Sequence, residues 1–354
     1  MPAFREGKVI TVTLERRLLR ARVALPSGDC DAVGFPEMLG SVEAGDRVVL
    51  NTTGVDLGLG TGGVAFIVWN LDGTTPTVDL DGHIVKLRYT PWQREALSVE
   101  EPDSPHHEKL AAITSIDGMP VVACTLHSQV AGVAAGIKAT APDKRVGYLM
   151  TDGASLPLAW SDLVVDLKEK SFVDVTASCG HAFGGDLEAV NVFSGLAALR
   201  HAADCDVAIV AMGPGVVGTG TALGHTALEQ GQIIDATNAL AGRAIACLRI
   251  TFADERPRHQ GVSHHTITAL RLVAQTRATV VVPTLEESHA TTVRRQLDGA
   301  GIAGRHDVVT ADGAPGVRAL ETAGLRPASM GRPFESVREL FLAAAAAGAV
   351  AAKA

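Results

Sequence analysis

Seven apolar runs recur along residues 109–354, and the stretches between them carry apolar residues at helical spacing. Each run is apolar along nearly its whole length, which is typical of parallel strands buried on both faces. Repeated strand–helix units of this kind predict a doubly wound, mostly parallel sheet in three layers. The strands are expected at residues 121–126, 145–150, 173–177, 207–212, 244–250, 279–282 and 308–310.

The first hundred residues follow a different pattern. Short alternating runs are separated by turn residues, with no helical stretch between them, which favours a small β barrel or sandwich. Residues 97–108 hold two prolines and four acidic residues and read as a linker. We therefore expect an all-β domain over 1–96, a linker over 97–108 and a Rossmann-like α/β domain over 109–354. The β-domain strands are expected at 8–14, 20–25, 46–52, 64–69 and 83–89.

Charge and composition argue against nucleic-acid and membrane partners. The 354-residue chain has a net charge of -8 and no basic run, which argues against nucleic acid. Its longest apolar tract, residues 340–352, is rich in alanine and too short to span a bilayer, so no membrane partner is expected. Five scattered cysteines and the lack of a signal core indicate a cytoplasmic protein. The alanine-rich tract suits packing either in the domain's own core or against another subunit of a homo-oligomer.

A glycine-rich loop follows the expected strand 207–212. Gly213, Gly215, Gly218, Thr219 and Gly220 precede a helix expected over about 221–240, and this arrangement suits anion binding because glycines and helix amides approach the ligand. The spacing also matches the dinucleotide fingerprint, which needs an acid about 20 residues on, at the end of the next strand. That strand ends near residue 254, so a nicotinamide or flavin site is disfavoured. Phosphate or carboxylate binding and a plain tight turn remain as alternatives.

Residues 252–266 are the densest cluster of functional side chains, and ligands in such sheets bind beyond the strand ends. Arg256 and Arg258 suit a phosphate or carboxylate. Asp254, His259 and His264 suit proton transfer or a metal, although no three-ligand spacing identifies a metal. The alternative is an exposed loop with Arg–Asp pairs, in which residue 263 only caps the next helix.

Two further strand exits carry candidates. Asp152 lies in an Asp-Gly-Ala turn, where it is either a ligand-binding residue or a turn former. His181 is flanked by glycines after the expected strand 173–177 and is a candidate acid or base. Asp186 is expected to cap a helix that begins at residue 187.

Several motifs together resemble an uncharacterised bacterial family, the domain of unknown function DUF3866, over most of the chain. They are Thr-Asp-Gly-Ala from Thr151, Gly-His-Ala-Phe-Gly-Gly-Asp-Leu-Glu-Ala-Val-Asn from Gly180, the glycine loop from Met212, Arg-His-Gln-Gly-Val-Ser-His-His from Arg258 and Ser-Met-Gly-Arg from Ser329. This resemblance implies no activity, substrate or cofactor.

The residues favour an enzyme of hydrolase or transferase type that acts on a small anionic ligand, phosphorylated or nucleotide-like. The glycine loop would form the floor, Arg256 and Arg258 would neutralise charge, and histidines would transfer protons, with a divalent metal near Asp254 left open. The alternatives are a non-catalytic ligand sensor or assembly subunit and, less favoured, an NAD(P)-dependent oxidoreductase. The sequence names no cofactor.

Overall fold

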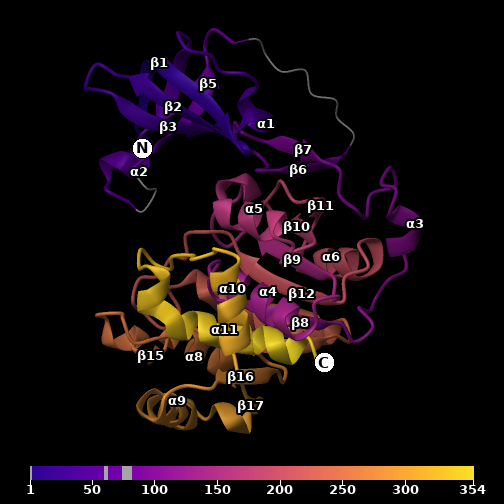
Figure 1. The fold of residues 1–354 in the computed structure, drawn as a ribbon. Coiled ribbons are helices and arrows are strands. Elements are labelled where there is room, and N and C mark those ends of the chain that lie inside the picture. The colour runs from indigo at the N-terminus through magenta and orange to yellow at the C-terminus, as the bar shows by residue number, and fades with distance from the viewer. Residues whose placement is uncertain (1, 60–62, 74–81) are drawn as a thin grey trace. The chain divides into compact units, whose positions relative to one another are not determined.

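The computed structural model describes residues 2–59, 63–73 and 82–354. The chain divides into two compact units (Figure 1). The first comprises residues 1–80 and 87–94, and the second comprises residues 81–86 and 95–354.

The first unit is a closed barrel of five strands in the order β1-β2-β3-β5-β4. Every neighbouring pair is antiparallel except β3 and β5. Alternate side chains such as Val23, Val48 and Leu50 point inward and form its core. The strands are β1 (Phe4–Glu15), β2 (Leu18–Ala24), β3 (Cys30–Gly34), β4 (Arg47–Asn51) and β5 (Ala65–Asn70), with short helices α1 (Pro36–Leu39) and α2 (Thr53–Asp56). An N-terminal barrel is thus confirmed.

One of the expected barrel strands was wrong. The fifth barrel strand is β3, which the sequence did not predict, because its buried residues are consecutive rather than alternating. The expected strand 83–89 is shorter, β6 (Ile84–Lys86), and it pairs with β7 (Arg94–Ala96) in a separate two-stranded sheet. It stops because Leu87 has a φ of 53°, which is incompatible with a strand.

The second unit is built on an eight-stranded sheet, and all its neighbouring strands run parallel. The strand order is β11-β10-β9-β12-β8-β13-β16-β17. The strands are β8 (Pro120–Ala123), β9 (Val146–Thr151), β10 (Val175–Cys179), β11 (Leu187–Ala189), β12 (Val207–Met212), β13 (Arg243–Cys247), β16 (Thr279–Pro283) and β17 (Asp307–Ala311). The parallel α/β sheet is confirmed, because these near-continuous apolar runs are buried from both sides.

Two helical layers cover the sheet. The helices are α3 (His107–Leu110), α4 (Gln129–Thr140), α5 (Asp162–Glu169), α6 (Val192–Ala197), α7 (Glu229–Ala239), α8 (His264–Thr268), α9 (Glu287–Gly299), α10 (Ala314–Thr322) and α11 (Arg338–Ala351). Alternate strand residues such as Ile209 and Ile245 pack with α4, α5, α10 and α11. On the other face, Ala208 and Ala244 pack with α6, α7, α9 and the π-helical turn after α8.

Glycines let α4 and α11 approach closely. A Cβ at Gly136 would lie 2.1 Å from the Ala345 carbonyl oxygen, and one at Gly348 would lie 2.1 Å from the Val133 carbonyl oxygen. Every alanine of α11 except Ala349 is buried, most of them against the sheet and α4. The alanine-rich tract therefore closes the core of its own unit.

The segment around β11 corrects a second expectation. Residues 187–189 form β11 rather than the start of a helix, and α6 begins later, where Asn191 caps it. Asp186 therefore caps no helix: it accepts hydrogen bonds from Thr176 and pairs with Lys168. No helix in the part of the chain that the structure describes is both long and apolar enough to cross a bilayer.

Candidate functional site

The connections after β8 and β12 leave the sheet in opposite directions. These strands are neighbours, yet β8 leads into α4 on one face and β12 leads into α7 on the other. A parallel sheet has its natural binding crevice where such a reversal occurs, beyond the carboxyl ends of the strands. The segments after β12, β8 and β13 therefore define where the site is to be sought.

The glycine loop after β12 folds back on itself. Gly218 forms a β-bridge with His225, and the Thr219 amide donates to the Gly224 carbonyl oxygen at 2.8 Å. The helix expected from residue 221 begins only at the 3-10 turn Thr226–Leu228, which leads into α7. The loop thus presents no helix N-terminus to a ligand, and instead it positions His225.

Buried glutamines and a small hairpin fix the segment after β13. Gln129 and Gln230 donate to the carbonyl oxygens of Leu248 and Cys247. Beyond them, β14 (Ile250–Thr251) pairs antiparallel with β15 (Gly261–Val262) and folds residues 252–260 back toward the sheet. Ser263 then caps α8, accepting a hydrogen bond from the His265 amide.

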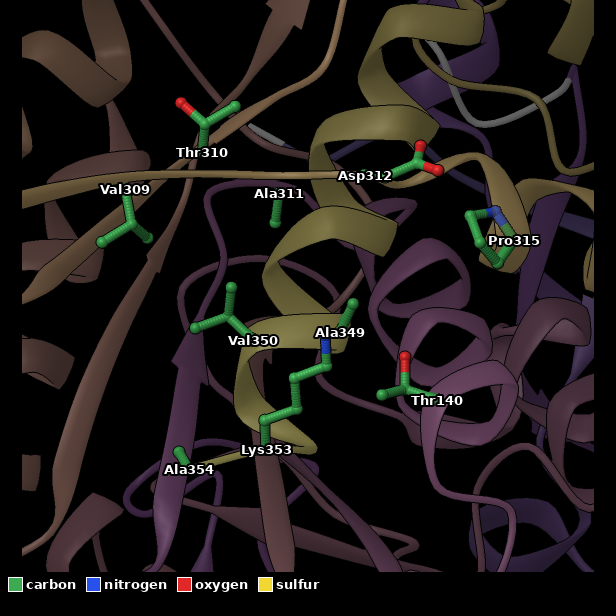
Figure 2. A pocket seen from close by; sticks show the side chains of 10 residues that line it. All are labelled: Thr140, Val309, Thr310, Ala311, Asp312, Pro315, Ala349, Val350, Lys353 and Ala354. Carbon is green, nitrogen blue, oxygen red and sulfur yellow. The ribbon is translucent and has the colours of Figure 1, made fainter.

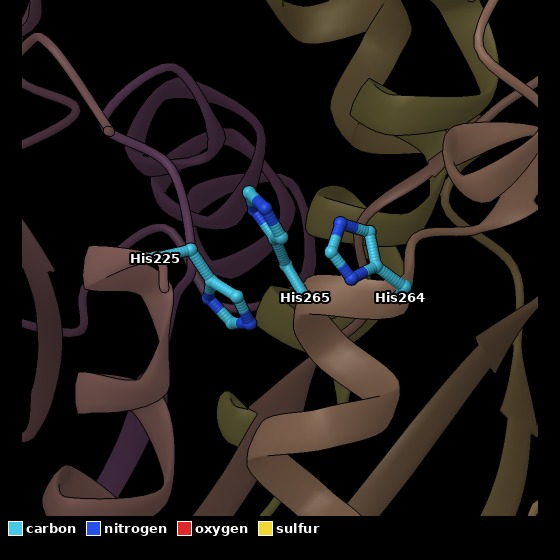
Figure 3. A group of neighbouring side chains, drawn as sticks. All are labelled: His225, His264 and His265. Carbon is cyan, nitrogen blue, oxygen red and sulfur yellow. The ribbon is translucent and has the colours of Figure 1, made fainter. Parts of the chain in front are cut away.

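Four imidazoles meet where these segments converge. The His225 ring stacks on that of His265 with centroids 4.0 Å apart, and His264 lies 4.4 Å from His265 (Figure 3). His259 lies 5.0 Å from both His264 and His265, and its Nδ1 contacts the Ser263 hydroxyl at 2.8 Å. Both ring nitrogens of His225 and Nε2 of His264 are buried and have no hydrogen-bond partner in the described chain. Polar atoms left this way are costly unless a ligand or solvent satisfies them.

A buried arginine underlies the cluster. Arg249 is 2% exposed, and its guanidinium donates to His265 Nδ1 at 3.1 Å. The contact fixes the tautomer of a neutral His265, because a guanidinium can only donate and the ring proton must then sit on Nε2. That nitrogen faces the glycine loop, since it lies 3.1 Å from the position of a Cβ at Gly218. No salt bridge joins Arg249 to a carboxylate among the described residues.

Asp254 forms salt bridges with two neighbouring arginines. Its carboxylate, 1% exposed, accepts hydrogen bonds from Nε and Nη2 of Arg256 and lies 3.4 Å from the Arg332 guanidinium. Hydrogen bonding to Arg256 holds the pKa of Asp254 far below its usual value. Arg258 is exposed and approaches the glycine loop at Gly220. A carboxylate so fully paired is a poor base.

The imidazoles are neutral at physiological pH. Burial, with Arg249 as the next contributor, lowers the pKa of His259 to about 3. Burial and the neighbouring His225 lower the pKa of His265 to about 2 and also lower the pKa of His264. Burial lowers the pKa of His225 as well, against an opposing contribution from the Ala222 backbone. The positive charge of the site therefore comes from its arginines.

His225, His264 and His265 are close enough to suggest a metal centre, since one nitrogen from each falls within 4.8 Å of the others. A metal bound to imidazole lies close to the ring plane, at about 2.0–2.1 Å from nitrogen. The planes of His225 and His265 are stacked and only 16° apart, so they do not converge on one ion. Arg249 also occupies Nδ1 of His265 and leaves a proton on Nε2. In this arrangement the three histidines do not fit a shared metal.

The other predicted residues form a separate group at the ends of β9 and β10. The His181 amide donates to the Asp152 carboxylate at 2.9 Å. Near them Glu229, at the start of α7, accepts a hydrogen bond from the Thr151 hydroxyl at 2.8 Å. Burial raises the pKa of Glu229 to about 7, which suits proton transfer at neutral pH.

The glycine-loop residues differ in what they do. A Cβ at Gly213 would lie 2.3 Å from the Ser155 carbonyl oxygen, so that glycine is needed for chain packing. Gly215 has a φ of 104° and open space around it. Thr219 hydrogen-bonds to Thr221 and Gly224 inside the loop.

Sequence reasoning missed Arg249, His225, Arg332 and Glu229 as members of these groups. Arg249 had a usable signal, because a lone arginine interrupts the apolar run 244–250. Arg332 ends the Ser-Met-Gly-Arg motif, but nothing in the sequence related it to Asp254, which lies almost 80 residues earlier in the chain.

Comparison with known proteins gives one match. A family model described as "Protein of unknown function (DUF3866)" matches residues 31–348. No curated protein and no solved structure matches the chain.

Proposed function

This chain belongs to the DUF3866 family of proteins of unknown function, and we propose that its histidine–arginine site binds a small phosphorylated ligand and acts on it as a hydrolase or transferase. We use "histidine–arginine site" for His225, His259, His264, His265, Arg249, Arg258 and the Asp254–Arg256–Arg332 group.

Arg249 is the observation that carries the proposal. A guanidinium that is 2% exposed and forms no salt bridge with a described carboxylate is expensive to maintain in a folded protein. The guanidinium donates to a neutral imidazole, and Asp254 offsets its charge only in part, because that carboxylate is already paired with Arg256 and Arg332. An anionic ligand beside Arg249 would supply the missing charge and offset that cost.

The surrounding charges favour a doubly charged oxyanion. Asp254 is buried, forms salt bridges with Arg256 and Arg332 and interacts electrostatically with Arg249, while Arg258 lies at the edge beside Gly220. The neutral imidazoles add hydrogen-bond donors and acceptors without adding charge. This balance fits a phosphate monoester dianion better than a single carboxylate.

The imidazoles have distinct roles in this proposal. His265 donates from Nε2 toward the ligand on the glycine-loop side, because Arg249 holds its tautomer. His264 offers Nε2, which has no partner in the described protein and is free to take or give a proton at the reacting oxygen. Arg258, beside Gly220, neutralises charge at the exposed edge. Asp254, expected from sequence as catalytic, positions Arg256 and Arg332 instead.

Phosphate binding is the direct test. Inorganic phosphate should raise the thermal midpoint of the wild type. At a phosphate concentration a hundred times the dissociation constant, binding should add about 2.7 kcal/mol to the free energy of unfolding. Arg249→Met should abolish this response. Arg243→Met should leave it intact, because Arg243 is exposed at the opposite end of β13. Equal ionic strength of sodium chloride serves as the salt control.

Turnover separates an enzyme from a sensor. The wild type should release phosphate from at least one member of a panel of phosphate monoesters, and His264→Gln should lose that activity while it still binds inorganic phosphate. Binding without turnover throughout the panel would assign a ligand sensor. The absence of any response to phosphate in the wild type would overturn the proposal altogether.

A nicotinamide site has less support. The strand after the glycine loop, β13, is followed by Leu248 and Arg249, so no carboxylate stands where a ribose would be held. Titration of NADPH fluorescence with the protein tests this alternative.

We also infer a cytoplasmic location. All five cysteines are free thiols, and four of them are buried. Unpaired thiols of this kind suit a reducing compartment. Localisation of a fluorescent fusion in the native host tests the inference.

A further inference from the structure

The last strand of the sheet, β17, has no second pairing strand among the described residues. It pairs with β16 on one side, and Val308 and Val309 are 40% and 37% exposed. The opposite edge, β11, is covered by the protein's own chain, because the Val99 amide donates to the Glu188 carbonyl oxygen. Exposed apolar edge strands are prone to pair with another strand.

The hydrogen bonds to β16 decide which backbone groups of β17 face outward. The Asp307 amide donates to the Ala278 carbonyl oxygen at 3.0 Å, and the Ala311 carbonyl oxygen accepts from Thr284 at 2.9 Å. Backbone groups alternate in direction along a strand, so those of residues 307, 309 and 311 face β16. The amides and carbonyls of Val308 and Thr310 therefore face outward.

We propose that β17 pairs antiparallel with β17 of a second copy of this chain, across a two-fold axis at Val309. In this register Val308 lies opposite Thr310 of the other copy. The pair of Val308 with Thr310 of the other copy exchanges two backbone hydrogen bonds, and the two-fold axis produces a second, identical pair. The outward-facing amides and carbonyls of Val308 and Thr310 in both copies are then all hydrogen-bonded. Val309 faces its own counterpart, and Asp307 lies opposite Ala311 rather than another acid.

Charges at the strand ends favour a second copy as the occupant. Arg305 precedes β17 and Asp312 follows its end, while Arg277 is already paired with Asp307 of the same copy. With Val309 on the two-fold axis, an antiparallel pairing brings Arg305 of one copy near Asp312 of the other, and the axis repeats this contact. A strand from an unrelated protein would have no reason to match this pattern, whereas an isologous interface repeats each contact by symmetry.

Hollows beside the strand leave room for the partner's flanking side chains. One, of about 690 Å³, lies between β17 and the ends of α4 and α11, with Val309 and Val350 in its lining (Figure 2). Another, of about 430 Å³, is lined by Val308, Thr310 and residues of α9. Together they flank an apolar strip that dimerisation would remove from water.

Cysteine cross-linking tests both the pairing and its register. In a Cys30→Ser background, Val309→Cys should form an intermolecular disulfide on mild oxidation, because non-hydrogen-bonded antiparallel neighbours have Cβ atoms about 4.5–5.5 Å apart. Val308→Cys is the matched control on the same strand with similar exposure. Residue 308 of the other copy is a diagonal neighbour, with the two residues roughly 7 Å apart, which is too far for a disulfide. Equal cross-linking of the two variants, or none, would overturn the proposal.

Sedimentation equilibrium gives a second, independent reading. The wild type should sediment as a dimer. Thr310→Pro should sediment as a folded monomer, because it removes an outward amide that β16 does not use. A monomeric wild type, or a dimer that survives Thr310→Pro, would contradict the inference. Association with a different protein in place of self-association would equally contradict it.

Discussion

Replacing Arg249 with methionine should make the ligand-free protein more stable while it removes the response to phosphate. The guanidinium is 2% exposed, and burial, together with the neighbouring Arg256 and Arg332, lowers its pKa from 12.5 to about 10 against an opposing contribution from Asp254. A shift of that size means that the folded state holds the charge at a cost of about 3 kcal/mol relative to water. Methionine fills similar space without the charge.

The substitution also removes a favourable contact. The hydrogen bond from Arg249 to His265 contributes about 1 kcal/mol, so the expected net gain is about 2 kcal/mol in the free energy of unfolding. For a unit of this size, such a gain corresponds to a rise of about 4–8 °C in the thermal midpoint.

The assay is differential scanning calorimetry at pH 7.5, with and without inorganic phosphate. The matched control, Arg243→Met, removes an exposed guanidinium that donates to the Gly118 carbonyl oxygen, and it should change stability little. A lower midpoint for Arg249→Met than for the wild type without phosphate would refute the reasoning, since Arg249 would then be a structural residue. A phosphate response that persists in Arg249→Met would refute its role in binding.

Three other predictions concern burial. Glu229→Gln should add about 3 kcal/mol to the free energy of unfolding above pH 7 and nothing below pH 4.5. Between these values the unfolded wild type has given up the proton while the folded protein still holds it, so the wild type loses stability as the pH rises to about 7. Urea denaturation at several pH values measures the difference. Lys86→Met should cost about 3 kcal/mol by leaving Glu188 without its buried cation, and the added change Glu188→Gln should recover part of this loss in the same urea measurements. Gly136→Ala should cost about 1–3 kcal/mol or more by thermal denaturation, because the new methyl group would meet a carbonyl of α11 at 2.1 Å.

Each of these has a result that contradicts it. A pH-independent difference for Glu229→Gln would mean that the carboxyl is not held protonated. A double variant at Lys86 and Glu188 no more stable than the single one would mean that the pair is not energetically coupled. Gly299→Ala is the control for the glycine, because no atom would lie within 4 Å of its Cβ. A similar loss in both glycine variants would attribute the effect to something other than helix contact.

The parallel sheet was predictable because strands buried on both faces are continuous apolar runs, which a short window of sequence shows. The strand expected at 207–212 is β12 with the same limits, since a parallel strand between two helical layers needs apolar residues throughout. The barrel strand β3 was not predictable, because its consecutive buried residues give no alternation. The helix start near residue 221 was wrong because the pairing of Gly218 with His225 overrode the local preference.

Local sequence pattern identified only some residues of the histidine–arginine site. The sequence by itself determined that polar residues follow the strands, and it singled out Arg258, His259 and His264. Only the tertiary structure decided that His225 and Arg332 join them, because the strand order and the C-terminal segment bring them there through contacts across long stretches of chain. Such contacts are selected by the packing free energy of the whole unit, and no short window of sequence contains it.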